Sequence, residues 1–289
     1  MSSVLTIEAL LTQAQKAFSE EAIDTPRLDA EILLARILDK PRTYLMTWPE
    51  REVSPNEAQT FEQWVHRRLQ LEPVAYILGD QEFYGHLFKV SPAVLIPRPE
   101  TEHLVEKALD WCRLKKLAAP QILDLCTGSG CVGLTVALEL PAAQVTLSEL
   151  CPEAKSIAQQ NRDVHGLEKR VQVLEGDLFE SITAGQTFDL VLANPPYVEE
   201  SFADQMQKDV RDYEPHLALF APEDGLSLIR RIIGEAPPYL KPGGLLAFEI
   251  GAGQSARVQS LWGKAWKEPG IIKDLSGHDR TVYAEYQGI

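Results

Sequence analysis

An asparagine followed by two prolines and a tyrosine is the stretch of this sequence best suited to chemistry. The apolar run at positions 190–193 is typical of a buried strand, and it leads into Asn194, Pro195, Pro196 and Tyr197. Because proline cannot donate to a strand ladder or continue a helix, we expect the strand to end here. In an open α/β sheet, ligands bind at this end of a strand. An amide and a ring held there can bind a small planar group, although a plain strand that runs into a proline loop also fits.

A glycine-rich turn is the second candidate. A strand-like run at 122–125 is followed by Cys126, Thr127, Gly128, Ser129 and Gly130, and then by a helical pattern. The two glycines let a ligand approach the backbone, and the start of a helix offers N–H groups without intrahelical partners. The turn does not match G-x-G-x-x-G and has no Walker lysine. It is either a ligand-binding loop or only a tight turn.

Two later strand ends carry groups that suit a nucleoside. Glu149 follows a predicted strand and lies 25 positions after Asp124, close to the spacing at which an acid binds a ribose in dinucleotide folds. The next strand ends at Gly176, Asp177 and Leu178, where an acid and an apolar side chain can meet the amino group and face of an adenine. A strand-end acid and an ordinary turn are the simpler interpretations.

The elements that must position these residues begin with a helical region. Residues 1–72 have only helical periodicity, which predicts a small bundle with Asn56 as the cap of one helix. Such a bundle either packs the fold or docks a macromolecular partner. Residues 73–97 contain short strand-like runs broken by glycines, which predict a β-hairpin linker. These runs lie at 74–78, 82–85 and 87–90.

Strands and helices alternate through residues 98–289. A helix that begins near Pro99 is followed by the βαβ order of a mostly parallel, doubly wound sheet. Late in this order we expect a helix at about 226–240 and a strand at 244–250. The chain closes with a predicted antiparallel hairpin at the sheet edge, formed by 271–274 and 281–286.

The composition is that of a globular chain. It has 289 residues, of which 45% are hydrophobic, and a net charge of −14 that opposes broad binding to a phosphate backbone. No apolar run approaches the roughly 18 residues of a membrane span, and the N-terminus lacks the features of a signal peptide, so we expect a cytoplasmic protein. The four cysteines show neither disulfide nor metal spacing, so we expect no metal. Isolated histidines are more often structural than catalytic, so we place none in the site.

Taken together, these strand ends resemble the class I S-adenosyl-L-methionine-dependent methyltransferases. The tetrapeptide from Asn194 to Tyr197 is similar to the signature of members that methylate planar nitrogens. Upstream segments resemble the linker of the HemK/PrmC family, the release factor glutamine N5-methyltransferases. These segments are 73–79, 82–85 and 94–102, and the likeness extends to Asp279 and Arg280 in the final hairpin.

The resemblance implies a Rossmann-like sheet that uses S-adenosyl-L-methionine. It implies that the methionine and ribose portions of this cofactor are held by Cys126, Thr127, Gly128, Ser129 and Gly130. Glu149 would hold the ribose, Leu178 would lie at the adenine, and Asn194 would also lie beside the cofactor. The substrate glutamine, from the Gly-Gly-Gln motif of peptide chain release factors, would be held by Asn194, Pro195, Pro196 and Tyr197. Among these, Asn194, Pro195 and Tyr197 are the expected catalytic residues.

Two positions depart from the family pattern. The family usually has glycine at the position of Cys126 and aspartate at the position of Glu149. Cys126 is strained if its position requires a positive φ, and fits if only the lack of bulk matters. Glu149 keeps the carboxylate and adds one methylene. We expect weakened or shifted cofactor contacts at most, with no loss of activity.

The main alternative is a nucleic-acid adenine N6-methyltransferase, because the same tetrapeptide geometry serves an exocyclic amine. The charge of −14 and the lack of a Lys/Arg-rich insertion near the site oppose it. A non-enzymatic binding protein would carry a damaged tetrapeptide, and this one is intact. We therefore expect a monomeric enzyme of translation termination, with residues 1–72 docking the release factor and 98–289 catalysing transfer. We expect no nucleic-acid or membrane partner.

Overall fold

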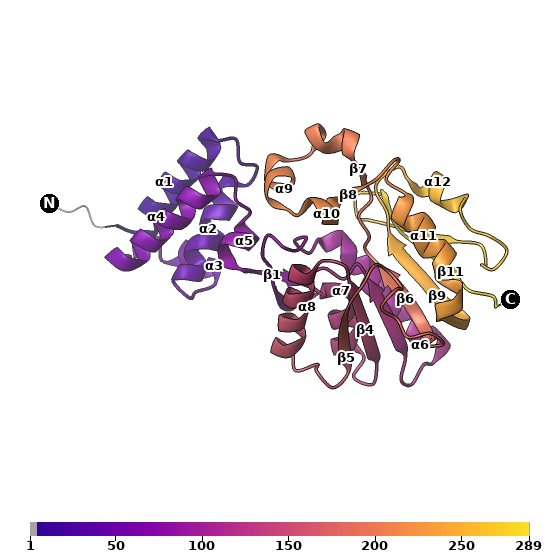
Figure 1. Ribbon diagram of the computed structural model, residues 1–289. Coiled ribbons are helices and arrows are strands. Elements are labelled where there is room, and N and C mark those ends of the chain that lie inside the picture. Colours follow the sequence, from indigo (N-terminus) through magenta and orange to yellow (C-terminus); the bar gives the residue numbers. More distant parts are fainter. Residues whose placement is uncertain (1–4, 289) are drawn as a thin grey trace. The chain divides into compact units, whose positions relative to one another are not determined.

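The chain folds into two compact units (Figure 1). The structure is a computed structural model that describes residues 5–288. The helical unit comprises the residues up to Gly79 together with Gln207–Tyr213. The sheet unit comprises Asp80–Met206 together with the chain from Glu214 onward. The segment Gln207–Tyr213 therefore belongs to the helical unit, although the chain on both sides of it belongs to the sheet unit.

The helical unit is a bundle around one apolar core. Its helices are α1 (Ile7–Glu20), α2 (Pro26–Ile37), α3 (Arg42–Thr47), α4 (Pro55–Leu69), α5 (Val74–Leu78) and α9 (Lys208–Tyr213). In α1 the buried residues recur at helical spacing, and Thr6 caps the helix by accepting the N–H of Ala9 at 3.3 Å. The core contains, among others, Leu11, Phe18, Leu33, Leu34 and Phe61. Burial of these side chains stabilises the bundle.

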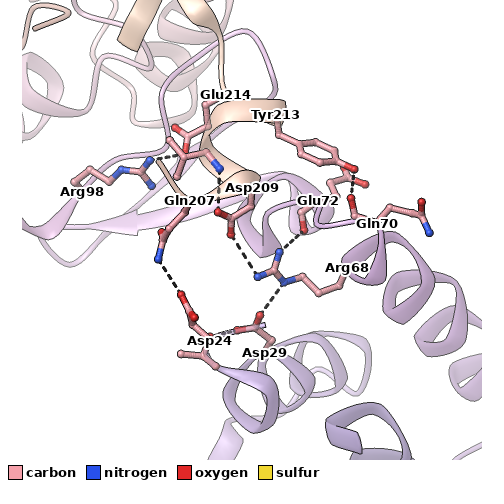
Figure 2. Close-up of polar contacts among 12 residues, drawn as sticks. Asp24, Asp29, Arg68, Gln70, Glu72, Arg98, Gln207, Asp209, Tyr213 and Glu214 are labelled. Carbon is pink, nitrogen blue, oxygen red and sulfur yellow. Dashed lines mark hydrogen bonds and ion pairs between the residues drawn. The ribbon is translucent and has the colours of Figure 1, made fainter. Parts of the chain in front are cut away.

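Polar contacts fasten α9 to the other helices of this unit (Figure 2). Arg68 of α4 is 7% exposed, and its Nε donates to Asp29 Oδ2 of α2 at 2.8 Å. Its Nη2 donates to Asp209 Oδ2 of α9 at 3.5 Å. The hydroxyl of Tyr213 donates to the carbonyl of Gln70 at 2.6 Å. Because a buried guanidinium must be paired, the two aspartates balance Arg68 and hold α9 against α2 and α4.

The prediction for the cap of α4 was wrong by two residues. The side chain of Ser54, not of Asn56, caps this helix: it accepts the N–H of Glu57 at 3.3 Å. In return, the Glu57 carboxylate accepts the N–H of Ser54 at 2.9 Å. This reciprocal pair is a capping box, for which Ser-x-x-Glu is the sequence signal.

The strand predicted at 74–78 is also wrong, because these residues form α5. The helix follows Pro73 and ends at Gly79, which has φ +79° and donates its N–H to the carbonyl of Ala75 at 2.8 Å. Three successive side chains of α5, from Ala75 to Ile77, are buried. A short apolar run that is buried on several sides has no periodicity that separates a helix from a strand.

The sheet unit is built on a seven-stranded sheet. Its strands are β3 (Gln121–Leu125), β4 (Gln144–Glu149), β5 (Val171–Glu175), β6 (Phe188–Ala193), β9 (Leu240–Glu249), β10 (Gly270–Lys273) and β11 (Asp279–Glu285). The order across the sheet is β10-β11-β9-β6-β3-β4-β5. The five strands from β9 to β5 pair in parallel, whereas β11 is antiparallel to both β9 and β10. This confirms the predicted, mostly parallel sheet with an antiparallel edge hairpin.

Helices cover both faces of this sheet (Figure 1). They include α6 (Glu102–Lys115), α7 (Cys131–Glu139), α8 (Pro152–Val164), α11 (Ser227–Glu235) and α12 (Ser255–Gln259). Side chains alternate between faces along each strand. Leu190 and Leu192 of β6 therefore pack in one apolar cluster with α6, α7 and α8, while Val191 packs in a second cluster with α11 and α12. Two clusters of opposite faces make the sheet a rigid base for the residues at its edge.

Prolines shorten the helix that was predicted at 226–240. Helix α11 ends at Glu235, and a 3-10 helix at Pro237–Tyr239 leads into β9. Two successive prolines lack the N–H groups that a continued α-helix needs. Strand β9 consequently begins at Leu240, four residues before the predicted start.

Short elements complete the sheet unit. A hairpin of β1 (Asp80–Phe83) and β2 (His86–Lys89) is present, and its strands begin two residues and one residue before the runs predicted at 82–85 and 87–90. Strand β7 (Val198–Glu199) pairs in parallel with β8 (Phe220–Ala221). The remaining helices are α10 (His216–Leu219) and 3-10 turns at Pro99–Thr101 and Glu200–Gln205. Within residues 5–288, no helix has the length and apolar character needed to cross a bilayer.

Candidate active site

One cavity of the sheet unit lies at the carboxyl ends of the parallel strands. Because β3, β4, β5 and β6 run in parallel, the segments that follow them meet at one edge of the sheet. All four contribute to the cavity wall, through Cys126–Ser129, Ser148–Cys151, Gly176–Leu178, and Asn194 with Pro196. The topology thus brings together residues that lie far apart in the sequence.

Asp124, in β3, holds the loop that follows this strand through hydrogen bonds. This side chain is 1% exposed, and its Oδ2 accepts the Thr127 hydroxyl at 2.5 Å and the N–H of Gly133 at 3.0 Å. Burial raises the pKa of Asp124 to about 7, although the two hydrogen bonds oppose the shift. Gly130 has φ +83° and precedes α7, and a Cβ there would lie 2.8 Å from the Leu134 side chain. Both residues fix the shape of the loop, and Gly130 does not line the cavity.

Cys126 occupies a backbone conformation that favours glycine. Its φ is +53°, in the left-handed region that is costly for residues with a Cβ. Of the two interpretations of this departure from the family pattern, the strained one therefore applies. Burial raises the pKa of the Cys126 thiol, as does the nearby Glu149 carboxylate. The thiol consequently stays protonated, which does not suit a nucleophile.

Glu149 links the ends of two strands. It is 8% exposed; its Oε2 accepts the N–H of Gly128 at 2.8 Å and its Oε1 accepts the N–H of Cys151 at 3.0 Å. Burial raises the pKa of Glu149, and the backbone hydrogen bonds oppose this shift. Each oxygen retains a lone pair after accepting one N–H. The carboxylate is therefore held in place while it can still accept hydroxyl groups of a ligand.

The segment after β5 places an apolar residue, Leu178, beside an acid that is already in an ion pair, Asp177. Leu178 has φ +50°, and its carbonyl accepts the Ser148 hydroxyl at 2.8 Å. Asp177 Oδ2 lies 2.8 Å from Arg231 Nη1 in an ion pair. Both Asp177 and Leu178 line the cavity. Leu178 provides an apolar surface there, whereas the charge of Asp177 is balanced by Arg231.

Only part of the tetrapeptide after β6 lines the cavity. Asn194 and Pro196 line the cavity, whereas Pro195 and Tyr197 are not among its lining residues. The Asn194 Nδ2 donates to Thr101 Oγ1 at 3.3 Å, and the Tyr197 hydroxyl donates to Glu249 Oε1 at 2.9 Å. Burial is the main cause that raises the pKa of Tyr197, so its phenol stays protonated.

Two other segments of the cavity wall are held together by the buried carboxylate of Glu214, which sequence reasoning did not identify. Glu214 accepts the N–H of Ile96 at 3.1 Å. It also pairs with Arg98 (Figure 2). Arg98 lines the cavity, as do Pro215, Leu217 and Ala218 directly after Glu214. Glu214 thereby holds two wall segments together.

Sequence reasoning missed three residues at this site: Thr101, Glu214 and Glu249. The available signals were an acid at the end of an apolar strand, for Glu249, and an acid before a proline, for Glu214. Among the described residues, no histidine lines the cavity. Residues 5–288 also contain no group of three or more His, Cys, Asp or Glu placed to hold a metal ion.

Known proteins are similar to this chain in fold and in sequence. A 16S rRNA methyltransferase of T. thermophilus, solved with AdoMet and guanosine, matches with a TM-score of 0.55 and 19% identity, over 72% of this chain and 50% of its own. The sheet unit therefore has a methyltransferase fold. The release factor glutamine methyltransferase of Koribacter versatilis is 41% identical over 96% of this chain and 98% of its own length. This chain belongs to the release factor glutamine methyltransferase family.

Further matches agree with this family. The relative from Vibrio cholerae that carries the same name is 41% identical over 98% of each chain. The family model described as the PrmC N-terminal domain matches residues 9–79, and the one described as the methyltransferase small domain matches residues 108–211. The resemblance that the linker segments suggested is thereby confirmed.

Proposed function

We propose that this chain transfers a methyl group from S-adenosyl-L-methionine to the side-chain amide nitrogen, N5, of the glutamine in the Gly-Gly-Gln motif of peptide chain release factors. One observation carries the proposal: Asn194 lines the same cavity as Gly128, Glu149 and Leu178. A group that can bind an amide and groups that suit a nucleoside thus face one space. The names of the relatives supply the identity of the protein substrate.

The residues present fit this cofactor. Glu149 has lone pairs available for two ribose hydroxyls, and Leu178 offers an apolar surface to an adenine. The backbone of the loop from Cys126 to Ser129 borders the cavity where the methionine portion would lie. When bound, S-adenosyl-L-methionine supplies a methyl group on a positively charged sulfur.

Asn194 and Pro195 provide the acceptors that a substrate amide needs. The lone pair of a primary amide nitrogen is delocalised into its carbonyl, so the nitrogen is a weak nucleophile. The side-chain oxygen of Asn194 and the backbone carbonyl of Pro195 each accept one N–H of the substrate. These acceptors stabilise positive charge that develops on the nitrogen. Proline has no backbone N–H and no polar side chain, so the carbonyl of Pro195 is its only hydrogen-bonding group.

Orientation supplies most of the rate in this proposal. Holding the nitrogen in line with the methyl group is worth up to about 7–11 kcal/mol in favourable cases. Tyr197 restricts rotation of the amide plane, and its phenol is fixed by Glu249. No general base is required, because an N-methylated amide cation is very acidic and loses its proton to water.

The helical unit is proposed to dock the release factor. Met46 at the end of α3 and Trp48 just after it are 59% and 50% exposed, and exposed aromatic and methionine side chains are enriched at protein interfaces. Trp48→Ala should raise the KM for the release factor and leave the KM for the cofactor unchanged. Leu275→Ala, at a fully exposed residue of the sheet unit, is the matched control. The proposed enzyme acts as a monomer in the cytoplasm, where release factors work.

Transfer of radioactive methyl tests the proposed function. The purified chain is incubated with methyl-labelled S-adenosyl-L-methionine and a bacterial release factor, with plasmid DNA, or with ribosomal RNA. Mass spectrometry should locate one added methyl on the glutamine of the Gly-Gly-Gln peptide. Label that enters nucleic acid and not the release factor would overturn the proposal in favour of an adenine N6-methyltransferase.

A further inference from the structure

The buried carboxylate that fixes the Tyr197 phenol has a second hydrogen-bond partner, Thr101, which the mechanism above does not use. Glu249 is the last residue of β9 and is 3% exposed. Its Oε1 accepts the Tyr197 hydroxyl at 2.9 Å, and its Oε2 accepts the Thr101 hydroxyl at 2.6 Å. Each oxygen therefore receives a proton donor from a different segment of the sheet unit. Because a buried carboxylate is costly without such donors, both hydroxyls are expected to keep pointing at Glu249.

Thr101 connects Glu249 to Asn194 through hydrogen bonds. Thr101 is 2% exposed, and its oxygen lies 3.3 Å from Asn194 Nδ2. A threonine hydroxyl has a single proton to donate and two lone pairs that accept. Because the proton is donated to Glu249, Thr101 presents only lone pairs to Asn194. The Asn194 carboxamide must then turn its NH₂ group toward Thr101 and its Oδ1 away.

This orientation decides what Asn194 offers to a substrate. With Oδ1 turned away from Thr101, Asn194 offers an acceptor, which matches the N–H of a carboxamide. With the amide reversed, Asn194 would offer N–H donors, which match the oxygen of a carboxylate. Glutamine and glutamate have nearly the same shape, but only glutamine has N–H groups at the end of its side chain. The orientation of the Asn194 amide therefore determines which of the two side chains the site binds.

We propose that Glu249 is a positioning residue that acts through Thr101 to fix the Asn194 amide, and that this makes the site select a carboxamide over a carboxylate. The inference rests on the proposed function and names how its substrate is recognised. Glu249 touches neither substrate nor cofactor in this scheme. Its second hydrogen bond, to Tyr197, holds the ring of the same tetrapeptide.

Groups from several segments of the sheet unit act on the pKa of the Glu249 carboxyl. Burial raises this pKa, as does the charge of Glu100, whereas the two hydroxyl donors and the charge of Arg280 lower it.

A glutamine at position 249 is similar in size to glutamate but has one acceptor oxygen instead of two. One hydroxyl would lose its acceptor, and an NH₂ group facing Thr101 would release the threonine proton toward Asn194 Oδ1. Glu249→Gln therefore permits the reversed amide.

Paired substrates test this inference. Two release factors are prepared, one natural and one with glutamate in place of the Gly-Gly-Gln glutamine. The kcat and KM are measured with the first, and the inhibition constant with the second, for wild type, Thr101→Val, Thr101→Ser and Glu249→Gln. Cofactor affinity is measured by calorimetry. Thr135→Val is the matched control, because Thr135 is a fully buried threonine of α7 whose hydroxyl has no hydrogen-bond partner among the described residues.

The expected pattern separates positioning from mere support of the fold. Thr101→Val and Glu249→Gln should lower kcat by about tenfold or more. The preference for glutamine, which is the inhibition constant of the glutamate release factor divided by the KM of the natural one, should fall toward unity. Cofactor affinity should stay within about threefold of wild type. Thr101→Ser should restore both quantities, and Thr135→Val should match wild type. Lower kcat with an unchanged glutamine preference would overturn the inference, as would unchanged kcat. If wild type fails to methylate the natural release factor, the proposed function itself has failed.

Discussion

The backbone N–H of Gly128 lies 2.8 Å from Glu149 Oε2, so the loop after β3 and the end of β4 share one carboxylate. The other oxygen of Glu149 accepts the N–H of Cys151. The Glu149 side chain thus holds the two segments together where they border the cavity. The extra methylene of glutamate, relative to the aspartate usual in the family, is accommodated within these two hydrogen bonds.

Glu149→Gln should weaken cofactor binding. Glutamine can accept only one of the two backbone N–H groups, and its NH₂ group would face the other donor. We expect the Kd for S-adenosyl-L-methionine to rise by about tenfold or more, with kcat at saturating cofactor within about threefold of wild type. Calorimetry and steady-state kinetics measure the two quantities. Glu175→Gln, at the exposed end of β5, is the control, and an equal effect there would contradict a specific role for Glu149.

Asn194→Ala should abolish turnover and spare the cofactor. The alanine lacks the side-chain acceptor for the substrate amide, so we expect kcat to fall by at least about a hundredfold. The Kd for S-adenosyl-L-methionine should stay within about threefold. Loss of both to the same extent would mean that Asn194 serves the cofactor or the fold instead.

Glycine at position 126 should be more stable than alanine there. The positive φ of Cys126 penalises any Cβ, so we expect Cys126→Gly to exceed Cys126→Ala in unfolding free energy by about 1 kcal/mol. Urea unfolding of both variants measures the difference. Ala137→Gly, in the interior of α7, is the control, and there alanine should be more stable than glycine by about 1 kcal/mol. The same sign at both positions would exclude strain at Cys126.

Asp124 should make stability fall as pH rises. Its folded pKa of about 7 lies above the ordinary 3.8, so its contribution is complete below about pH 4 and is lost as pH rises through 7. The difference corresponds to about 4 kcal/mol. Asp124→Asn retains an oxygen that can accept from both Thr127 and Gly133, and it does not titrate. Urea unfolding from pH 4 to 8 should show wild type losing stability relative to this variant; parallel curves would refute the raised pKa.

Local patterns predicted the sheet and the residues that follow its strands. The turn at Gly128, the acid at Glu149 and the prolines after Asn194 each stand at the end of an apolar run, and parallel strands bring such ends to one edge. Pattern alone was enough to propose that they share a cavity. The same reasoning failed for α5, where burial on several sides removed the periodicity on which it depends.

The contacts that orient the site could not be predicted in this way. Thr101 lies 93 positions from Asn194 and 148 positions from Glu249, and Glu214 lies 116 positions from Arg98. Hydrogen bonds between such distant segments depend on how the chain packs, and they leave no spacing in the sequence. Strain at Cys126 stayed one of two interpretations until its φ was known, because the sequence of a loop does not reveal the sign of a φ.

The placement of α9 in the helical unit has a consequence for chain integrity. The polypeptide crosses between the units after Gly79, after Met206 and after Tyr213. A protease cut after Gly79 would therefore leave the N-terminal fragment bound to the rest of the chain, because its Arg68 is still paired with Asp209 on the other fragment. We expect the two pieces to co-elute as a nicked complex, and separately expressed halves to reassemble around α9.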